Sequence, residues 1–351
     1  MWKKGANTMD ILKKSFGKTA DLFILKNNQG SELAVSNQGA RIVSLKVMVD
    51  GKLRETVLGF DSIEEYLEKD PYIGASIGRF SGRIKQGTFT IEQQQYQVSV
   101  DSETGHNLHG GIGFDKYMWE ATEKIAKDFV AVTFTFTSPD GDQGFPGNLT
   151  AKVTYTLTNK NEWKIFYTAT TDKATIYNPT NHVYFNLTGD STKGIDEHIL
   201  KMKAERYIEV DKQVIPTGNV NSVQGTIFDF TQGEKMSELF TNVASEASKI
   251  DGLDHPFLLN KQSPQVTLTS PDKKVIIEMT TDDPAVVVFT ANVGDEGPIM
   301  HGKKLANHGG ITLETQVAPG ATDYPEWGNV ILKPNERFEK ETVFKLIIQE
   351  S

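Results

Sequence analysis

The stretch Val130 to Phe136 reads Val-Ala-Val-Thr-Phe-Thr-Phe, so that a large apolar side chain returns at every second position. A period of two is that of a β-strand, whose successive side chains point to opposite faces of a sheet. Leu149 to Leu157 and Trp163 to Ala169 repeat the alternation, and Gly144-Phe145-Pro146-Gly147 supplies a turn between the first two runs. These three runs therefore predict successive strands joined by turns.

The same alternation extends outward in both directions along the chain. Lys13 to Val49 reads as a run of short strands between turn signals, and so do most apolar runs of the second half. Those later runs are Gln265 to Thr269, Val275 to Met279, Val286 to Ala291, Gly310 to Thr315 and Thr342 to Gln349. Only Asp61 to Lys69, where Ser62 and Glu65 fit a capping box, and Lys235 to Ile250 are predicted to be helical.

Many short strands with few short helices indicate the all-β class and a large antiparallel sandwich. No sequence repeat argues for a propeller. No linker or low-complexity tract divides the 351 residues, so we expect one domain over residues 1–351, with residues 1–12 as a candidate flexible extension at the N-terminus.

Composition excludes several classes of function. Apolar residues make up 38% of the chain and charged residues 24%, which is ordinary for a soluble globular protein. The net charge of -9, without a basic block, argues against nucleic acid as a partner. Because the chain has no cysteine, disulfides, thiolate metal sites and a cysteine nucleophile are excluded. No other metal-ligand motif is recognisable, so we expect no metal site.

The N-terminal segment carries no sign of export. Met1 to Asp10 lacks the apolar core of a signal peptide, and no apolar run approaches the length needed to span a membrane. We therefore expect no membrane association and favour the cytoplasm. Secretion or a periplasmic location stays open if a signal peptide preceded this sequence.

The segment Asn178 to Asp190 follows an alternating strand pattern that ends in a Gly-Asp turn, and it combines amide, hydroxyl and aromatic side chains around His182. Amides and hydroxyls suit the hydroxyl groups of a sugar, and ring faces suit its C–H faces. Imidazole is the side chain whose ordinary pKa permits proton transfer near neutral pH. His182 is therefore a candidate acid or base, with hydrogen bonding to a neighbouring backbone group as the structural alternative.

Further candidates lie in four other segments. Gly78 to Arg83 contains two arginines between glycines and predicts a tight loop that presents guanidinium groups. His109 precedes two glycines, where backbone can approach a ligand closely. Asp254 is followed by His-Pro-Phe, and Glu314 interrupts an apolar strand pattern. A carboxylate in such a strand either protects a sheet edge or acts as an acid or base.

Together these motifs resemble the aldose 1-epimerases, or galactose mutarotases, in order and in spacing. The matching motifs are Gly-Arg-Phe-Ser-Gly-Arg (78–83), Asn-Leu-His-Gly-Gly (107–111), Thr-Asn-His-Val-Tyr-Phe-Asn-Leu (180–187), Gly-Leu-Asp-His (252–255) and Leu-Glu-Thr-Gln (313–316). The resemblance runs from about Gly39 to the last strand. It implies an antiparallel β-supersandwich with a sugar cleft on one face. The implied activity interconverts the α and β anomers of free aldohexoses such as galactose and glucose, by acid–base ring opening and reclosure without a cofactor.

The resemblance also implies roles for individual residues. Glu314 is the expected general base and His182 the expected general acid. The expected sugar-binding residues are Arg83, His109, Tyr184 and Asp254. Two departures bear on specificity: Gly82 stands where some members have Asn, and Asp282-Asp283-Pro284 stands where Gln-Pro-Gly is common, which predicts a different cleft rim.

Three other functions remain open at the level of sequence. A hexose-6-phosphate 1-epimerase would need a basic pocket, for which the Gly-Arg loop offers Arg79 and Arg83. A non-catalytic sugar-binding protein would keep the cleft without the reaction. A glycosidase would use Asp254 and Glu314 as its carboxylate pair. The preferred aldose is not readable from the sequence, nor is the choice between a monomer and a homodimer.

Overall fold

The computed structural model describes residues 9–70, 72–243 and 250–349. Its largest sheet has nine antiparallel strands in the order β11-β12-β13-β14-β31-β24-β23-β18-β21. Their bounds are β11 Glu120–Ile125, β12 Phe129–Ser138, β13 Leu149–Thr158, β14 Glu162–Thr171, β18 Ile199–Met202, β21 Glu234–Lys235, β23 Val266–Thr269, β24 Val275–Thr281 and β31 Phe338–Ile348. The three alternating runs that opened the sequence analysis are β12, β13 and β14, which confirms that prediction.

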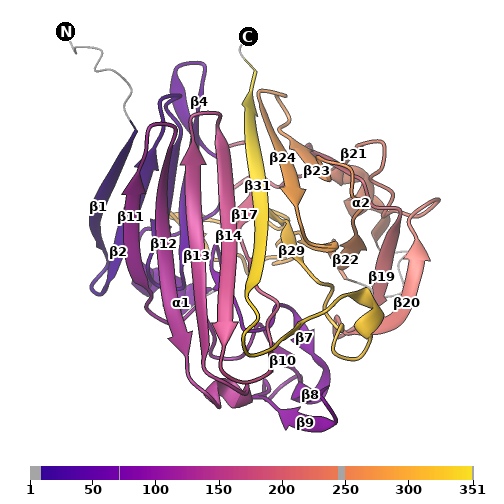
Figure 1. Ribbon diagram of the computed structural model, residues 1–351. Helices are drawn as coiled ribbons and strands as arrows, with labels where there is room; N and C mark the ends of the chain where they lie inside the picture. The colour runs from indigo at the N-terminus through magenta and orange to yellow at the C-terminus, as the bar shows by residue number, and fades with distance from the viewer. Residues whose placement is uncertain (1–8, 71, 244–249, 350–351) are drawn as a thin grey trace.

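A five-stranded antiparallel sheet lies behind the first half of this large sheet (Figure 1). It is formed by β1 Asp10–Phe16, β2 Ala20–Lys26, β3 Glu32–Ser36, β4 Arg41–Val49 and β5 Lys52–Glu55. The inward faces of the two sheets share one apolar core, in which the rings of Phe23 and Phe134 meet at 5.9 Å between centroids. Apolar side chains on the facing sides of two sheets are what hold a sandwich together. The expected all-β sandwich is therefore confirmed.

A third sheet carries two of the candidate carboxylates. Its order is β20-β19-β22-β25-β29, with β19 Arg206–Val210, β20 Pro216–Ser222, β22 Asp254–Leu258, β25 Ala285–Phe289 and β29 Glu314–Gln316. Short two-stranded ladders surround it. They are β6 Ser76–Ile77 with β16 Thr180–Asn181, β7 Arg83–Ile84 with β10 Asn107–Leu108, β17 Tyr184–Phe185 with β28 Ile311–Thr312, β8 Thr88–Ile91 with β9 Gln94–Gln97, β15 Thr175–Ile176 with β30 Ile331–Leu332, and β26 Ile299–Met300 with β27 Lys303–Lys304.

Two short α-helices, α1 Ile63–Lys69 and α2 Met236–Asn242, are present in the described chain. Neither has the length and apolar character needed to cross a lipid bilayer. Ser62 caps α1 by accepting a hydrogen bond from the backbone N–H of Glu65 at 3.4 Å. The Glu65 carboxylate reaches back to the N–H of Asp61 at 3.0 Å, one residue before the expected partner. The helix expected to reach Ile250 ends at Asn242, and residues 244–249 lie outside the described residues.

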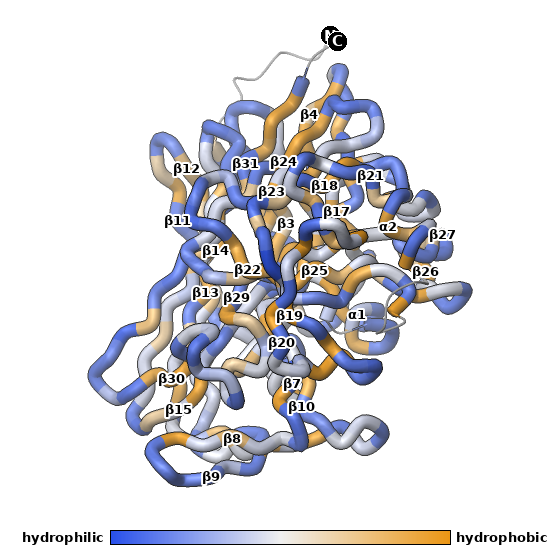
Figure 2. The backbone as a smooth tube through the Cα atoms, turned by 90° about the vertical axis from the view of Figure 1, so that its right-hand side faces the viewer, coloured by the Kyte–Doolittle hydropathy of each residue, from blue (hydrophilic) through white to orange (hydrophobic). Residues whose placement is uncertain are grey.

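Two expectations about local structure need correction. Asp10 to Leu12, expected within a flexible extension, pair with β2 as part of β1, while residues 1–8 lie outside the described residues. The Asn178 to Asp190 segment forms two two-residue strands instead of one continuous strand. His182 lies between these two strands. Figure 2 colours the chain by residue hydropathy and shows hydrophobic residues concentrated on the inner strands and hydrophilic residues at the turns.

Candidate active site

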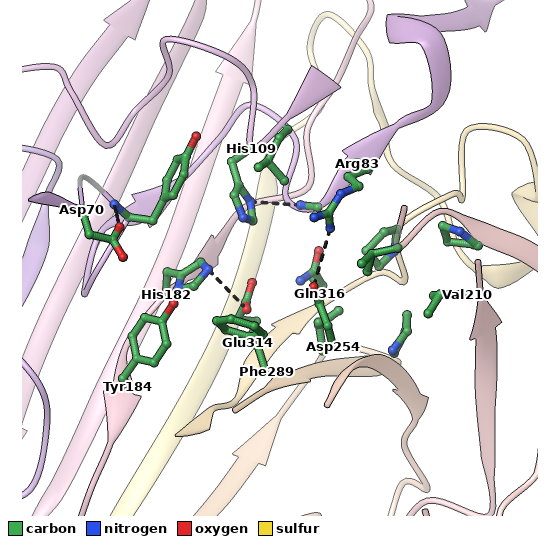
Figure 3. Close-up of a pocket in the computed structure, with 18 residues that line it drawn as sticks. Asp70, Arg83, His109, His182, Tyr184, Val210, Asp254, Phe289, Glu314 and Gln316 are labelled. Atoms are coloured by element: carbon green, nitrogen blue, oxygen red, sulfur yellow. Dashed lines mark hydrogen bonds and ion pairs between the residues drawn. The ribbon is translucent and has the colours of Figure 1, made fainter. Parts of the chain in front are cut away.

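One cavity of about 250 Å³ brings together all six residues singled out from the sequence. They come from segments far apart in the chain: Arg83 (β7), His109 (after β10), His182 (between β16 and β17), Tyr184 (β17), Asp254 (β22) and Glu314 (β29). Figure 3 shows His182 and Glu314 facing each other on one side, with Arg83, Gln316 and Asp254 gathered on the other. The cavity therefore separates a carboxyl–imidazole pair from a group of hydrogen-bonding side chains.

Backbone pairing on both sides fixes the carboxyl–imidazole pair. The N–H of His182 donates to Ala75 and its carbonyl accepts from Gly74, both at 2.9 Å. Glu314 pairs with Val287 across the third sheet, and its Oε1 accepts a hydrogen bond from Thr312 at 3.0 Å. As a result, Nε2 of His182 lies 3.6 Å from Oε1 of Glu314. The two groups can exchange or share a proton with only a small side-chain adjustment.

Burial determines the ionisation of this pair. Loss of solvent raises the pKa of Glu314 to about 8, although the hydrogen bond from Thr312 opposes the shift. Burial also lowers the pKa of His182. Both shifts disfavour charge, as expected for ionisable groups removed from water. Near neutral pH the pair therefore holds one proton, so that one member can donate while the other accepts.

His109 is held in a defined tautomer beside this pair. It adopts a left-handed backbone conformation with φ of 53°, and its Nδ1 accepts a hydrogen bond from the N–H of Gly82 at 3.2 Å. Its ring lies edge-to-face against His182 with centroids 5.2 Å apart. Burial, followed by the nearby His182, lowers the pKa of His109 well below the ordinary value. A neutral His109 that accepts at Nδ1 carries its proton on Nε2, which makes that nitrogen a donor.

The opposite side of the cavity has unused hydrogen-bonding capacity. Arg83 and Asp254 form a loose ion pair, with 3.8 Å between Nη1 and Oδ2. Burial raises the pKa of Asp254 to about 6, while the charge of Arg83 opposes the shift. The carboxamide of Gln316 is buried, and neither its oxygen nor its nitrogen has a hydrogen-bond partner among the described residues. A ligand with several hydroxyl groups would satisfy all three side chains.

Sequence reasoning missed several residues of the cavity wall. Gln316 was quoted within a motif, yet its unpaired amide could not be read from the sequence. The ring of Tyr72 lies tilted against that of His109 with centroids 4.9 Å apart, and Asp70 and Phe289 also line the cavity. No local pattern marked these three residues, because the tertiary fold brings the segment after α1, with Asp70 and Tyr72, and the end of β25, with Phe289, to the cavity.

Arg79 does not contribute to the cavity, contrary to the expectation that both arginines of the loop are presented. Its guanidinium is buried and donates to Ser138 Oγ at 3.0 Å and to the carbonyl of Pro146 at 2.7 Å, and it has further partners at Pro139 and Thr175. These acceptors fix the Gly-Arg loop against the end of β12. Arg83 is thus the arginine of this loop that reaches the cavity.

The Asp282-Asp283 departure also lies away from the cavity lining, which corrects the expectation of a changed rim. Lys340 of β31 is buried and donates to the Asp283 carboxylate at 2.8 Å. The same ammonium donates to the carbonyls of Thr315 and Pro179. Asp283 therefore neutralises the buried ammonium of Lys340 and does not line the cavity.

The antiparallel supersandwich and its polar cavity place the structure among proteins of the galactose mutarotase fold. Galactose 1-epimerase from Lactobacillus acidophilus NCFM superimposes with a TM-score of 0.87 at 29% identity, covering 97% of this chain and 99% of that one. The chain belongs to the aldose 1-epimerase family, whose model matches residues 21–345.

Two curated relatives support the family assignment over almost their whole length. The aldose 1-epimerase of Haemophilus influenzae is 38% identical over 94% of this chain and 96% of its own length. The human galactose mutarotase is 35% identical over 95% of this chain and 96% of its own length. The family resemblance expected from the five motifs is therefore confirmed.

Proposed function

We propose that this chain is an aldose 1-epimerase, an isomerase that interconverts the α and β anomers of free aldohexoses such as galactose and glucose. The observation that carries the proposal is the pairing of His182 Nε2 with Glu314 Oε1 at 3.6 Å inside a cavity rich in hydrogen-bonding groups. Membership of the family and the names of the relatives supply the substrate class.

The reaction needs one acid and one base at the same time. Ring opening removes the proton of the C1 hydroxyl and adds a proton to the ring oxygen, and reclosure after rotation about C1–C2 reverses both transfers. Glu314 would take the first proton and His182 would give the second. Positioned proton transfer of this kind typically contributes about a hundred- to ten-thousand-fold in rate. Because the two side chains complete the proton cycle, we propose that no metal or other cofactor takes part.

The base must be a carboxylate when substrate arrives, whereas burial of the empty site favours the neutral pair. The ionic form carries the same single proton, moved from Glu314 to His182. Attraction between the two charges and hydrogen bonds from the sugar hydroxyls to the carboxylate both favour this form. Substrate binding is therefore expected to shift the shared proton toward the imidazole.

The remaining residues would hold and orient the sugar. Arg83 and Asp254 would bind adjacent hydroxyls through charge-assisted hydrogen bonds. His109 would donate from Nε2. Tyr184, whose ring lies 5.1 Å from that of His182, would pack against the apolar part of the sugar. Such positioning lowers the barrier because the reacting atoms are already aligned with the acid and base.

The other functions considered from the sequence are less well supported. A hexose-6-phosphate substrate requires a basic pocket, but Arg79 is occupied elsewhere and Arg83 is alone in the loop in reaching the cavity. A non-catalytic sugar-binding protein has no need of a buried pair that shares a proton. A glycosidase needs two carboxylates in complementary roles, whereas Glu314 is paired with an imidazole, that of His182.

Polarimetry on freshly dissolved α-glucose and α-galactose tests the proposal. Optical rotation should approach its equilibrium value faster in proportion to enzyme concentration. The same assay with glucose 6-phosphate separates the phosphosugar alternative, and sugar binding without any acceleration would favour the non-catalytic one. Solution mass measurement would decide between a monomer and a homodimer.

A further inference from the structure

A third carboxylate, that of Asp70, lines the cavity besides those of Asp254 and Glu314. Asp70 is the residue at which helix α1 ends, and it is half-buried. Figure 3 shows Asp70 and Glu314 on opposite sides of the His182 ring. The proton transfer proposed above makes no use of Asp70, so this charged group has no role in it yet.

A short series of hydrogen bonds connects Asp70 with His182. The Asp70 carboxylate accepts from the backbone N–H of Tyr72 at 2.9 Å. The Tyr72 carbonyl accepts from the N–H of Ala75, and the Ala75 carbonyl accepts from the N–H of His182, both also at 2.9 Å. The Tyr72 ring is stacked on the His182 ring with centroids 6.2 Å apart. These contacts hold the Asp70 carboxylate in a fixed place relative to the imidazole.

The two ring nitrogens of His182 have different surroundings. Nε2 faces Glu314 at 3.6 Å, whereas Nδ1 is buried and has no hydrogen-bond partner among the described residues. Both nitrogens of an imidazolium carry a proton, and their N–H bonds diverge. Protonation of His182 therefore places a buried, positively charged N–H on the side of the ring away from Glu314. A negative charge on that side makes this charged form less costly.

Two carboxylates favour the charged form of His182. Burial lowers the pKa of the imidazole, while the charge of Asp70, and more weakly that of Asp254, opposes this shift. Asp254 already faces a cation, because its carboxylate lies 3.8 Å from the Arg83 guanidinium. Asp70 also acts on Arg41, whose buried guanidinium donates to backbone carbonyls. Asp70 is thus the stronger of the two carboxylates in its effect on the imidazole.

The other titratable groups around these side chains do not compete with Asp70. Burial lowers the pKa of His109 well below its ordinary value, so that this imidazole is neutral. Burial also raises the pKa of Tyr72 to about 12 and that of Tyr184 well above its ordinary value, which keeps both phenols neutral. The ammonium of Lys69 is engaged in an ion pair within α1. The charge that His182 meets on this side is therefore that of Asp70.

We propose that Asp70 is a positioning residue for the shared proton, whose negative charge favours His182 over Glu314 as the carrier. This inference rests on the proposed function, in which Glu314 must be a carboxylate when substrate arrives. The hydrogen bonds of the sugar hydroxyls to Glu314 act in the same direction, but only after binding. Asp70 contributes before binding, because its place is fixed by the fold. The competing account is purely structural, with Asp70 serving only to end α1 and to hold the N–H of Tyr72.

Asp70→Asn separates the charge from the hydrogen bond, because the amide oxygen can still accept from the N–H of Tyr72. Polarimetry should show kcat for α-galactose lowered by roughly threefold to thirtyfold, with KM nearly unchanged. Without the charge the imidazolium is less stable, so a lower pH is needed to protonate the pair. The acidic limb of the profile of kcat/KM against pH should therefore move by about half a pH unit or more toward lower pH.

Three further variants control the experiment. Asp70→Ser keeps a short acceptor for the same N–H and should act like Asp70→Asn. Asp70→Glu keeps the charge and should return the acidic limb to its original pH. Glu68→Gln removes one charge from an exposed position of α1 that does not line the cavity, and should leave kcat and the profile unchanged.

The shift of the acidic limb is the decisive result, because a merely structural role would not move it. An acidic limb that stays in place in both Asp70→Asn and Asp70→Ser would overturn this inference, whether or not kcat falls, and would leave the proposed function intact. An equal shift in Glu68→Gln would also overturn it, since the effect would then belong to overall charge. Lack of turnover of every sugar by the unaltered protein would overturn both proposals.

Discussion

His182 Nε2 and Glu314 Oε1 face each other at 3.6 Å, although one residue lies between β16 and β17 and the other begins β29 of a different sheet. Hydrogen bonds on both sides fix the backbone of His182, and the Thr312 hydroxyl holds the Glu314 carboxylate. Burial of the pair shifts both pKa values in the direction that removes charge. The pair therefore holds a single proton, which either the imidazole or the carboxylate can carry.

The pair predicts a bell-shaped dependence of kcat/KM on pH. Below the lowered pKa of His182, which lies under the ordinary 6.5, a second proton binds and no base remains. Above the raised pKa of Glu314, about 8, the single proton leaves and no acid remains. Activity should therefore be maximal between these limits, and the two apparent pKa values belong to the pair as a unit. Polarimetric rates from pH 5 to pH 9 check this, and a single sigmoid would contradict it.

Gln316 should contribute to sugar binding through its unpaired amide. Gln316→Leu should raise KM for galactose by roughly tenfold, because a ligand hydroxyl loses its partner. The same change should leave the melting temperature equal or higher, since a buried amide without hydrogen bonds is removed. A lower melting temperature with an unchanged KM would assign Gln316 to the fold instead.

Gln265 offers a matched control for this experiment. Its buried amide is fully engaged with the backbone of Thr281, donating at 3.0 Å and accepting at 3.3 Å. Gln265→Leu should therefore lower the melting temperature and leave KM unchanged. Gln316→Leu would thus change KM and Gln265→Leu would change the melting temperature.

Asp115 should make stability depend on pH. Neither carboxylate oxygen has a hydrogen-bond partner among the described residues, and burial raises the pKa to about 6 from 3.8. A raised folded-state pKa means that the contribution is fully favourable below pH 3.8 and is lost as the pH rises through 6. At pH 8 this shift leaves the free energy of unfolding lower by roughly 3 kcal/mol than it is below pH 3.8.

Asp115→Asn removes this dependence because the amide does not titrate. Relative to the unaltered protein, the variant should gain stability as the pH rises from 4 to 8, by up to about 3 kcal/mol. Urea denaturation at both pH values measures the difference. The same relative stability at pH 4 and pH 8 would show that the carboxylate has a partner in solution.

The fold was predictable to a large extent because strand periodicity is local. β12, β13 and β14 are long, and their predicted ends lie within two residues of the observed ones. The segment around His182 failed as a continuous strand because its backbone groups bond in turn to β6, to Ala75 and to β28. Such long-range pairing overrides the local pattern and leaves no trace in the sequence.

The site was predictable where several motifs combined, and its environment was not. Arg79 and Arg83 stand in equivalent local surroundings in the sequence, yet one guanidinium is buried against carbonyls and the other faces the cavity. Asp283, expected at the cleft rim, instead pairs with the buried ammonium of Lys340 at 2.8 Å. Both outcomes depend on which distant group approaches each side chain, which spacing along the chain does not encode.

Lys340 and Asp283 should be coupled in stability. Lys340→Met leaves Asp283 as an unpaired buried carboxylate and should destabilise the protein by about 3–5 kcal/mol. Adding Asp283→Leu should recover most of that loss, because no buried charge then remains. Lys235→Met, which breaks an exposed pair with Glu197, should cost less than about 1 kcal/mol. Chemical denaturation measures all three, and additive effects of the two buried substitutions would contradict the coupling.

The account rests on Glu314 acting as the base, and polarimetry on Glu314→Gln tests this most directly. The amide keeps the size of the carboxylate but cannot accept the proton of the C1 hydroxyl. We predict that kcat for α-galactose falls by about a hundred- to ten-thousand-fold, while calorimetry still detects galactose binding. Turnover of Glu314→Gln within a few-fold of the unaltered enzyme would contradict the central claim.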